Sequence, residues 1–94
     1  MGSAKRVRPD RLGEKLLTIR NHFECSLAGM AERLSDHKLK VNRTDISRYE
    51  LAQREPPLPV LLSYARLANI YVEILIDDRL DLPERIPAPR KLPV

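Results

Sequence analysis

Apolar positions in the first third of the chain follow the spacing of a buried helix face. After Asp10, which can cap a helix, they recur at intervals of four, three and four residues. This pattern predicts a first helix that ends near residues 22–24. Ser26 is a suitable N-cap for a second helix, which runs to about Leu34. The expected inward positions of the two helices are Leu12, Leu16, Ile19 and Phe23, and then Leu27, Met30, Ala31 and Leu34.

The clearest helix start in the chain lies at Asn42. Asn42 as the cap and Asp45 three residues later form a pair like a capping box, in which Asp replaces the usual Glu. The predicted third helix covers residues 43 to about 51 and turns Ile46 and Tyr49 inward. Its outward positions are Arg43, Thr44, Ser47 and Arg48.

Prolines and one asparagine delimit a fourth helix. Pro56 and Pro57 end the preceding element, whereas Pro59 is tolerated in a first helical turn because its missing N–H would have no partner there. Asn69 accepts the left-handed conformation and is predicted to end the helix. The expected apolar face consists of Leu58, Leu61, Leu62, Ala65 and Ala68.

The end of the chain contains an apolar run followed by a proline-rich segment. Residues 70–76 are ambiguous between helix and strand from their pattern alone, and the helices before them favour a fifth helix. From Leu82 onward the prolines break regular structure, so we expect an extended tail that is ordered only where it packs on something. The sequence therefore predicts an all-α fold of five helices. We expect a basic arm over residues 1–10, one helical domain over 11–78 and the tail over 79–94.

Charge is unevenly distributed along the 94 residues. The net charge is +4, and residues 1–54 hold twelve Lys or Arg against seven Asp or Glu, whereas residues 55–94 hold five against six. We expect the first half to bind a polyanion. Lys5, Arg6, Arg8 and Arg11 are either an arm that adds DNA contacts or an idle tail.

Few residues offer catalytic or metal-binding chemistry. Cys25 is the single cysteine, and with two histidines it forms no pattern typical of a metal site or of an activated nucleophile. We therefore expect no enzymatic activity and no cofactor. No apolar run approaches the roughly 20 residues that span a bilayer, and we expect a cytoplasmic protein.

The third predicted helix has the side chains of a DNA-reading element. An α-helix fits the major groove, and side chains near its N-terminus reach base edges, so we expect base contacts from the four outward residues 43, 44, 47 and 48. Polar residues around this helix and at the start of the second are expected to contact the sugar-phosphate backbone. They are Ser26, Lys38, Lys40, Asn42, Gln53 and Arg54. We interpret Asp45 as a cap rather than as an acceptor for cytosine, and Glu50 as an ion-pair partner of Arg54 or Arg48.

A family resemblance is carried by Asn42-Arg43-Thr44-Asp45-Ile46-Ser47-Arg48-Tyr49-Glu50 and by Gln53-Arg54-Glu55-Pro56. These segments resemble the Cro and lambda-repressor-like (Xre) helix-turn-helix family over roughly residues 12–76. The resemblance implies five helices, binding of double-stranded DNA as a homodimer and, usually, transcriptional repression. Two features depart from the family pattern. Leu27 stands where the family commonly has a DNA-contacting Gln, and about five extra residues, 35–39, precede the third helix, so either the second helix is longer or the connection protrudes.

The last apolar run also bears on assembly. Residues 70–76 contain too many apolar side chains for one face of a short helix, so we expect some of them to emerge at the surface and form a homodimer interface. The expected interface residues are Ile70, Tyr71, Ile74 and Leu75. Two copies of the third helix would then enter successive major grooves about 34 Å apart.

Two other functions fit the same pattern. In the first, the chain is an antitoxin that represses its own operon and binds a toxin through residues 82–94, which fold on their partner. In the second, the fold has lost DNA binding and recruits a protein through the fifth helix, with Leu27 and the lengthened connection as support.

Overall fold

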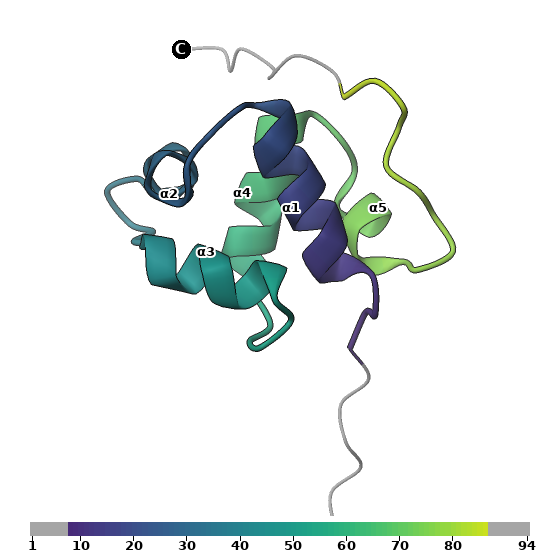
Figure 1. Cartoon of the computed structure of the whole chain (residues 1–94), viewed down its shortest axis with the longest axis horizontal. Coiled ribbons are helices and arrows are strands. Elements are labelled where there is room, and N and C mark those ends of the chain that lie inside the picture. The colour runs from purple at the N-terminus through teal and green to yellow at the C-terminus, as the bar shows by residue number, and fades with distance from the viewer. Residues whose placement is uncertain (1–7, 87–94) are drawn as a thin grey trace, which may run out of the picture.

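Five α-helices and no strands occur in residues 8–86, the part of the chain that the computed structural model describes. The helices are α1 (Leu12–His22), α2 (Leu27–Leu34), α3 (Arg43–Glu50), α4 (Leu58–Ala68) and α5 (Val72–Ile76). In Figure 1, α2 and α3 lie on one side of α1 and α4, and α5 lies on the other. None of these helices is long and apolar enough to cross a membrane. The predicted all-α architecture is confirmed, whereas Lys5, Arg6 and tail residues 87–94 lie outside the described part.

Local caps set several helix ends where the sequence places them. The Ser26 hydroxyl accepts a hydrogen bond from the Gly29 N–H at 3.0 Å and so caps α2. At α3 the Asn42 side chain accepts from the Asp45 N–H at 2.9 Å, while the Asp45 carboxylate accepts from the Asn42 N–H at 3.2 Å. Asn69 ends α4 in the left-handed conformation, with φ of 55°. These predictions are confirmed because each depends on atoms within four residues of one another.

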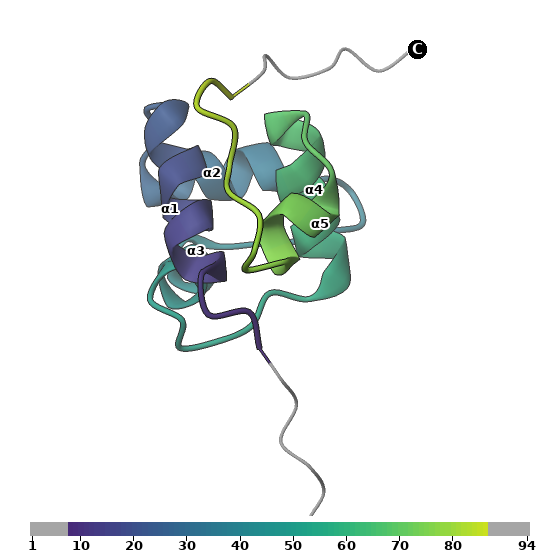
Figure 2. The same ribbon diagram turned by 90° about the vertical axis from the view of Figure 1, so that its right-hand side faces the viewer.

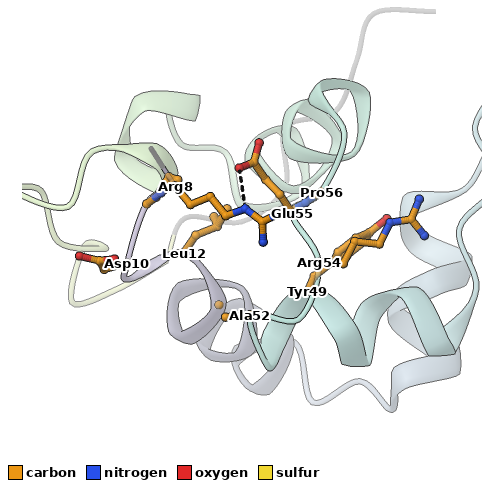
Figure 3. A pocket seen from close by; sticks show the side chains of 10 residues that line it. Arg8, Asp10, Leu12, Tyr49, Ala52, Arg54, Glu55 and Pro56 are labelled. Carbon is orange, nitrogen blue, oxygen red and sulfur yellow. Dashed lines mark ion pairs between the residues drawn. The ribbon is translucent and has the colours of Figure 1, made fainter. Parts of the chain in front are cut away.

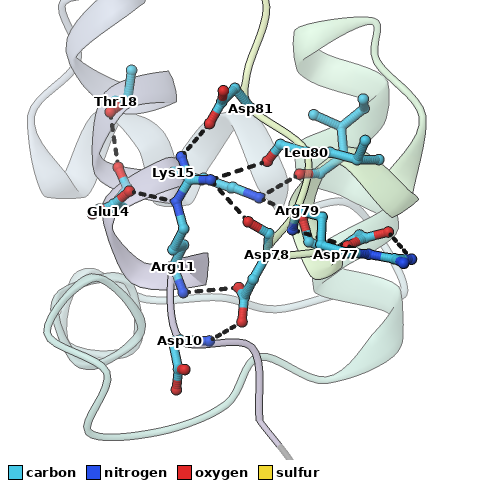
Figure 4. A network of polar contacts seen from close by, with 11 residues as sticks. Asp10, Arg11, Glu14, Lys15, Thr18, Asp77, Asp78, Arg79, Leu80 and Asp81 are labelled. Atoms are coloured by element: carbon cyan, nitrogen blue, oxygen red, sulfur yellow. Dashed lines mark hydrogen bonds and ion pairs between the residues drawn. The ribbon is translucent and has the colours of Figure 1, made fainter.

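The start of α1 differs from the prediction. Asp10 does not cap this helix; Arg11 occupies the N-cap position and its side chain makes no capping hydrogen bond. Instead, the Asp78 carboxylate accepts the N–H groups of Asp10 at 2.9 Å and Arg11 at 3.0 Å (Figure 4). These bonds hold the pKa of Asp78 below its ordinary value. The anion that suits a helix N-terminus is thus supplied from beyond α5.

The core joins all five helices through aliphatic side chains and two tyrosines. It consists of Leu12, Leu16, Ile19, Met30, Ala31, Leu34, Ile46, Tyr49, Val60, Leu61, Tyr64, Ala65, Ala68, Leu75 and Ile86. The predicted face of α4 was partly wrong, because Leu58 is 74% exposed and Leu62 42% exposed. Val60 and Tyr64 are buried in their place.

A close contact fixes α1 against the C-terminal end of α3. A Cβ atom on Gly13 would lie 2.6 Å from the Glu50 carbonyl oxygen, so only glycine permits this approach. Arg20 of α1 donates to both carboxylate oxygens of Glu50, at 2.7 and 2.9 Å, and to the Cys25 carbonyl at 3.0 Å. The bond to Glu50 raises the pKa of Arg20. The predicted partners of Glu50, Arg54 and Arg48, were therefore wrong, because Glu50 points into the α1–α3 junction.

α5 is shorter than the run of residues 70–76 and is held by a buried lysine. Lys15 of α1 is 2% exposed, and its ammonium group donates to the carbonyls of Ile74 at 2.8 Å and Asp77 at 3.0 Å (Figure 4). It thereby satisfies carbonyl groups at the C-terminal end of α5. Leu75 is fully buried in the core of its own chain, so it has no surface to offer a second copy, contrary to the expectation for the dimer interface.

The described part of the tail, residues 79–86, is bound to the domain. It runs between α1 on one side and α4 and α5 on the other (Figure 2). Ile86 is buried in the core, and Leu82 packs against the core from its edge. Arg11 secures the segment by donating to the Asp78 carbonyl at 2.9 Å and to the Asp81 carboxylate at 2.6 Å. Residues 79–86 are therefore ordered by packing, the condition under which order of the tail was expected.

Candidate nucleic-acid interface

α3 is anchored through one face and presents the other. Ile46 and Tyr49 are buried, and Glu50 is held by Arg20, so this side of the helix faces α1 and α2. All four residues predicted to read bases lie on the remaining surface. Arg43, Thr44 and Arg48 are exposed and Ser47 is half-buried. The helical spacing that turns Ile46 inward turns its neighbours outward, which is why this placement is readable from the sequence.

The charges on this outer face are largely uncompensated. Within residues 8–86, neither Arg43 nor Arg48 has an ion-pair partner or a side-chain hydrogen bond. The one carboxylate among the charged groups on this outer face belongs to Asp45. One of its oxygens accepts the Asn42 N–H, and the other lies 3.5 Å from the Arg54 guanidinium. Asp45 therefore acts as the cap that the sequence predicts and also holds Arg54.

The turn after α3 brings Gln53 and Arg54 back along the helix. Ala52 has φ of 59°, a left-handed conformation that turns the chain sharply. The N–H groups of Gln53 and Arg54 then donate to the Arg48 carbonyl, at 2.9 and 3.3 Å. Both side chains are exposed. Arg54 thereby reaches from the C-terminal end of α3 to Asp45 in its first turn.

The connection between α2 and α3 is a structured loop, residues 35–42, because α2 ends at Leu34. Of the two alternatives that the sequence leaves open, the structure has the protruding connection. Lys38 and Lys40 are exposed in it, as predicted, and Leu39 between them packs against the core. The loop leads directly into the cap of α3 (Figure 1).

The two remaining predicted backbone contacts, Ser26 and Asn42, use their side chains as caps. Their oxygens already accept N–H groups of their own helices. Both residues are exposed, and the Ser26 hydroxyl retains a hydrogen to donate. Leu27 follows Ser26, is half-buried and packs against the core. Its side chain therefore contributes to packing.

A cavity of about 240 Å³ borders this region without overlapping the outer face of α3 (Figure 3). It lies between residues 8–13 and the turn after α3, with Tyr49, Ala52 and Arg54 among its walls. The Arg8 guanidinium lies 3.8 Å from the Glu55 carboxylate across it. Burial, with the nearby Asp45 carboxylate, raises the pKa of the Tyr49 hydroxyl.

Several polar residues with structural roles were not predicted from the sequence, and three of them carry a local signal. Lys15 lies three residues after Leu12, on the apolar stripe of α1, and Glu50 lies four residues after Ile46, on the inward face of α3. Asp36 follows the last residues of α2, where Asp commonly bonds the backbone two or three residues ahead. At Lys15 and Glu50, a charged residue at an apolar position of a helix thus signals a partner within the fold.

Comparison of the chain with family models, with curated proteins and with solved structures gives no match. Within residues 8–86, no group of three His, Cys, Asp or Glu side chains is arranged to hold a metal ion.

Proposed function

We propose that the protein is a sequence-specific double-stranded DNA-binding protein of the lambda-repressor-like type, which acts as a homodimer and represses transcription. In this proposal α3 enters the major groove. One observation carries it: α3 is held firmly by Ile46, Tyr49 and Glu50, while Arg43, Thr44 and Arg48 on its other side are exposed. A rigid helix with free guanidinium groups is suited to base edges and phosphates.

The arrangement of charge supports DNA over a protein partner at this face. Lys38, Lys40, Gln53 and Arg54 flank α3 in the two loops at its ends. The major groove has a phosphate chain along each rim, so a helix in the groove brings its flanking loops to those rims. The exposed apolar side chains of α3 are limited to Leu51 at its C-cap. A face of this composition has little apolar area to bury against a protein.

We place the dimer interface on the exposed part of α5. Tyr71 is 77% exposed, and Val72 and Ile76 also emerge at the surface. Ile70 and Ile74 are half-buried. Exposed apolar side chains gathered on and next to one short helix favour burial of this surface by a second copy of the chain. A twofold arrangement of the two copies would present both α3 helices to successive major grooves.

The antitoxin alternative is less well supported by the tail. Leu82 and Ile86 pack on the chain's own core, so a partner that binds this segment would have to displace them. The alternative that keeps only protein binding has the exposed residues of α5 in its favour. Both alternatives predict a second protein that co-purifies with the chain, which the proposal does not require. Only the alternative that has lost DNA binding predicts that the pure protein binds no duplex.

The experiment that tests the proposal is fluorescence anisotropy with a random-sequence duplex and with fragments from upstream of the gene, between about 50 and 200 mM salt. We expect one fragment to bind far more tightly than the random duplex, with a logarithmic salt slope of several units. Arg43→Ala and Ser47→Ala should change which base pairs are preferred, by about 1–3 kcal/mol for the arginine. Lys38→Ala and Arg54→Ala should weaken all sequences and lower the slope by about 0.9 each. Absence of binding to any duplex at low salt would overturn the proposal.

A further inference from the structure

The loop between α2 and α3, residues 35–42, has an internal bonding pattern that leaves its lysines free. The Asp36 carboxylate accepts the N–H groups of Lys38 at 2.8 Å and Leu39 at 2.7 Å, and the Asp36 N–H donates to the Leu39 carbonyl at 2.8 Å. The Ser35 hydroxyl accepts the Val41 N–H at 2.9 Å and donates to the Val41 carbonyl at 3.1 Å. These bonds, together with the partly buried Leu39, fix the backbone on both sides of the lysines.

The carboxylate in this loop is the nearest anion to both lysines in the sequence, and it does not pair with either. Its hydrogen bonds go to the backbone, which lowers the pKa of Asp36. Lys38 and Lys40 are exposed, and neither ammonium group has an ion-pair partner within residues 8–86. Here, five hydrogen bonds order a short segment that carries two unpaired cations immediately before the cap of α3.

We propose that residues 35–42 are a preformed binding site for a phosphodiester group of DNA, with Lys38 and Lys40 as its ligands and Asp36 as the residue that positions them. The inference rests on the proposed function, which already takes Lys38 and Lys40 as backbone contacts, and adds that the hydrogen bonds of Asp36 preform the loop that presents them. A rigid loop loses less conformational entropy on binding than a flexible one, so ordering by Asp36 raises affinity. The longer connection then extends the contact to the phosphate chain beside the groove.

The decisive experiment compares Asp36→Asn with Asp36→Ala. The two variants have the same charge, and the asparagine oxygen can still accept the N–H groups of Lys38 and Leu39, whereas alanine cannot. Binding to a fluorescein-labelled random-sequence duplex is measured by anisotropy at several salt concentrations. We expect Asp36→Asn to bind at least as tightly as the wild type and Asp36→Ala to bind three- to tenfold more weakly than Asp36→Asn. Equal affinities of the two variants would overturn the positioning role.

The lysines are tested in the same assay against a charge-matched control. Lys38→Gln and Lys40→Gln should each lower the logarithmic salt slope by about 0.9, as expected for the loss of one phosphate contact. Arg85→Gln removes an exposed charge from residues 79–86, a segment that runs between α1 on one side and α4 and α5 on the other (Figure 2), and should leave the slope unchanged. If all three substitutions lower the slope equally, the loop is no specific site.

Two further results separate loss of fold from loss of the site. Ser35→Ala removes the bonds to Val41 without a change of charge and should weaken binding in the same direction as Asp36→Ala. Thermal melting followed by circular dichroism should show that the Asp36 variants are folded at the assay temperature. A wild-type protein that binds no duplex would overturn the site together with the proposed function. Wild-type binding with equal Asp36 variants would overturn only the positioning role of Asp36, and unchanged salt slopes for the lysine variants would overturn the phosphate site.

Discussion

Two sides of this small domain use basic residues in opposite ways. On the side formed by α1, α5 and the tail, Arg11 donates to Asp78, Leu80 and Asp81, and Lys15 is buried against the end of α5. On the side formed by α3 and its flanking loops, the basic side chains extend into solvent, and only Arg54 has an anion within 4 Å, among the described residues. Net charge alone does not distinguish these two uses. On the first side Arg11 and Lys15 make contacts within the fold, whereas on the second most basic groups remain accessible to solvent.

The largest expected effect comes from the pair that joins the two sides. Glu50→Ala would leave the Arg20 guanidinium, which is largely buried, without its carboxylate, at a cost of about 3 kcal/mol in the free energy of unfolding. Urea denaturation measures this change. Glu14→Ala is the matched control, because Glu14 pairs with Arg11 while 66% exposed and should cost less than about 1 kcal/mol. Equal effects of the two substitutions would mean that the α1–α3 junction does not depend on this pair.

A smaller change in stability is expected when the same substitution is made at one lysine on each side. Lys15→Met keeps most of the buried side-chain volume but leaves the carbonyls of Ile74 and Asp77 without a donor, which should cost about 2 kcal/mol of stability. The same substitution at the exposed Lys40 should leave stability within about 0.5 kcal/mol of the wild type and weaken DNA binding instead. Urea denaturation and anisotropy are measured on both variants. The comparison between the two sides fails if Lys40→Met destabilises the fold as much as Lys15→Met.

The smallest effect depends on pH. The N–H groups of Asp10 and Arg11 lower the pKa of Asp78 in the folded state. A carboxyl group with a lowered pKa adds stability that is present above its ordinary pKa of about 3.9 and is lost as the pH falls through the folded value. The melting temperature of the wild type should therefore fall below about pH 4. Asp78→Asn should melt lower at neutral pH and lose less on acidification; parallel melting curves for the two proteins would argue against this role of Asp78.

The limits of sequence-based prediction follow the same division. The caps at Ser26, Asn42 and Asn69 were predicted because each bond closes within a few residues. The outward set on α3 was predicted because the helical period relates it to Ile46 and Tyr49. By contrast, the Asp10 cap, the partner of Glu50 and the exposure of Leu75 were predicted wrongly, since each depends on a segment far away along the chain. Whether the exposed set reads DNA stays a prediction.

The sequence by itself determined the first four helices, the ends of most of them and the side of α3 that faces solvent, because these follow from local hydrogen bonds and from the periodicity of apolar residues. Only the tertiary structure decided which charged side chains are engaged in contacts within the fold. Lys15 meets the end of α5 across 59 residues of sequence, and Asp78 reaches the start of α1 across 68. Contacts over such separations are set by how the helices pack, and no local pattern encodes them. The free cations of α3 and its loop are what that packing leaves at the surface.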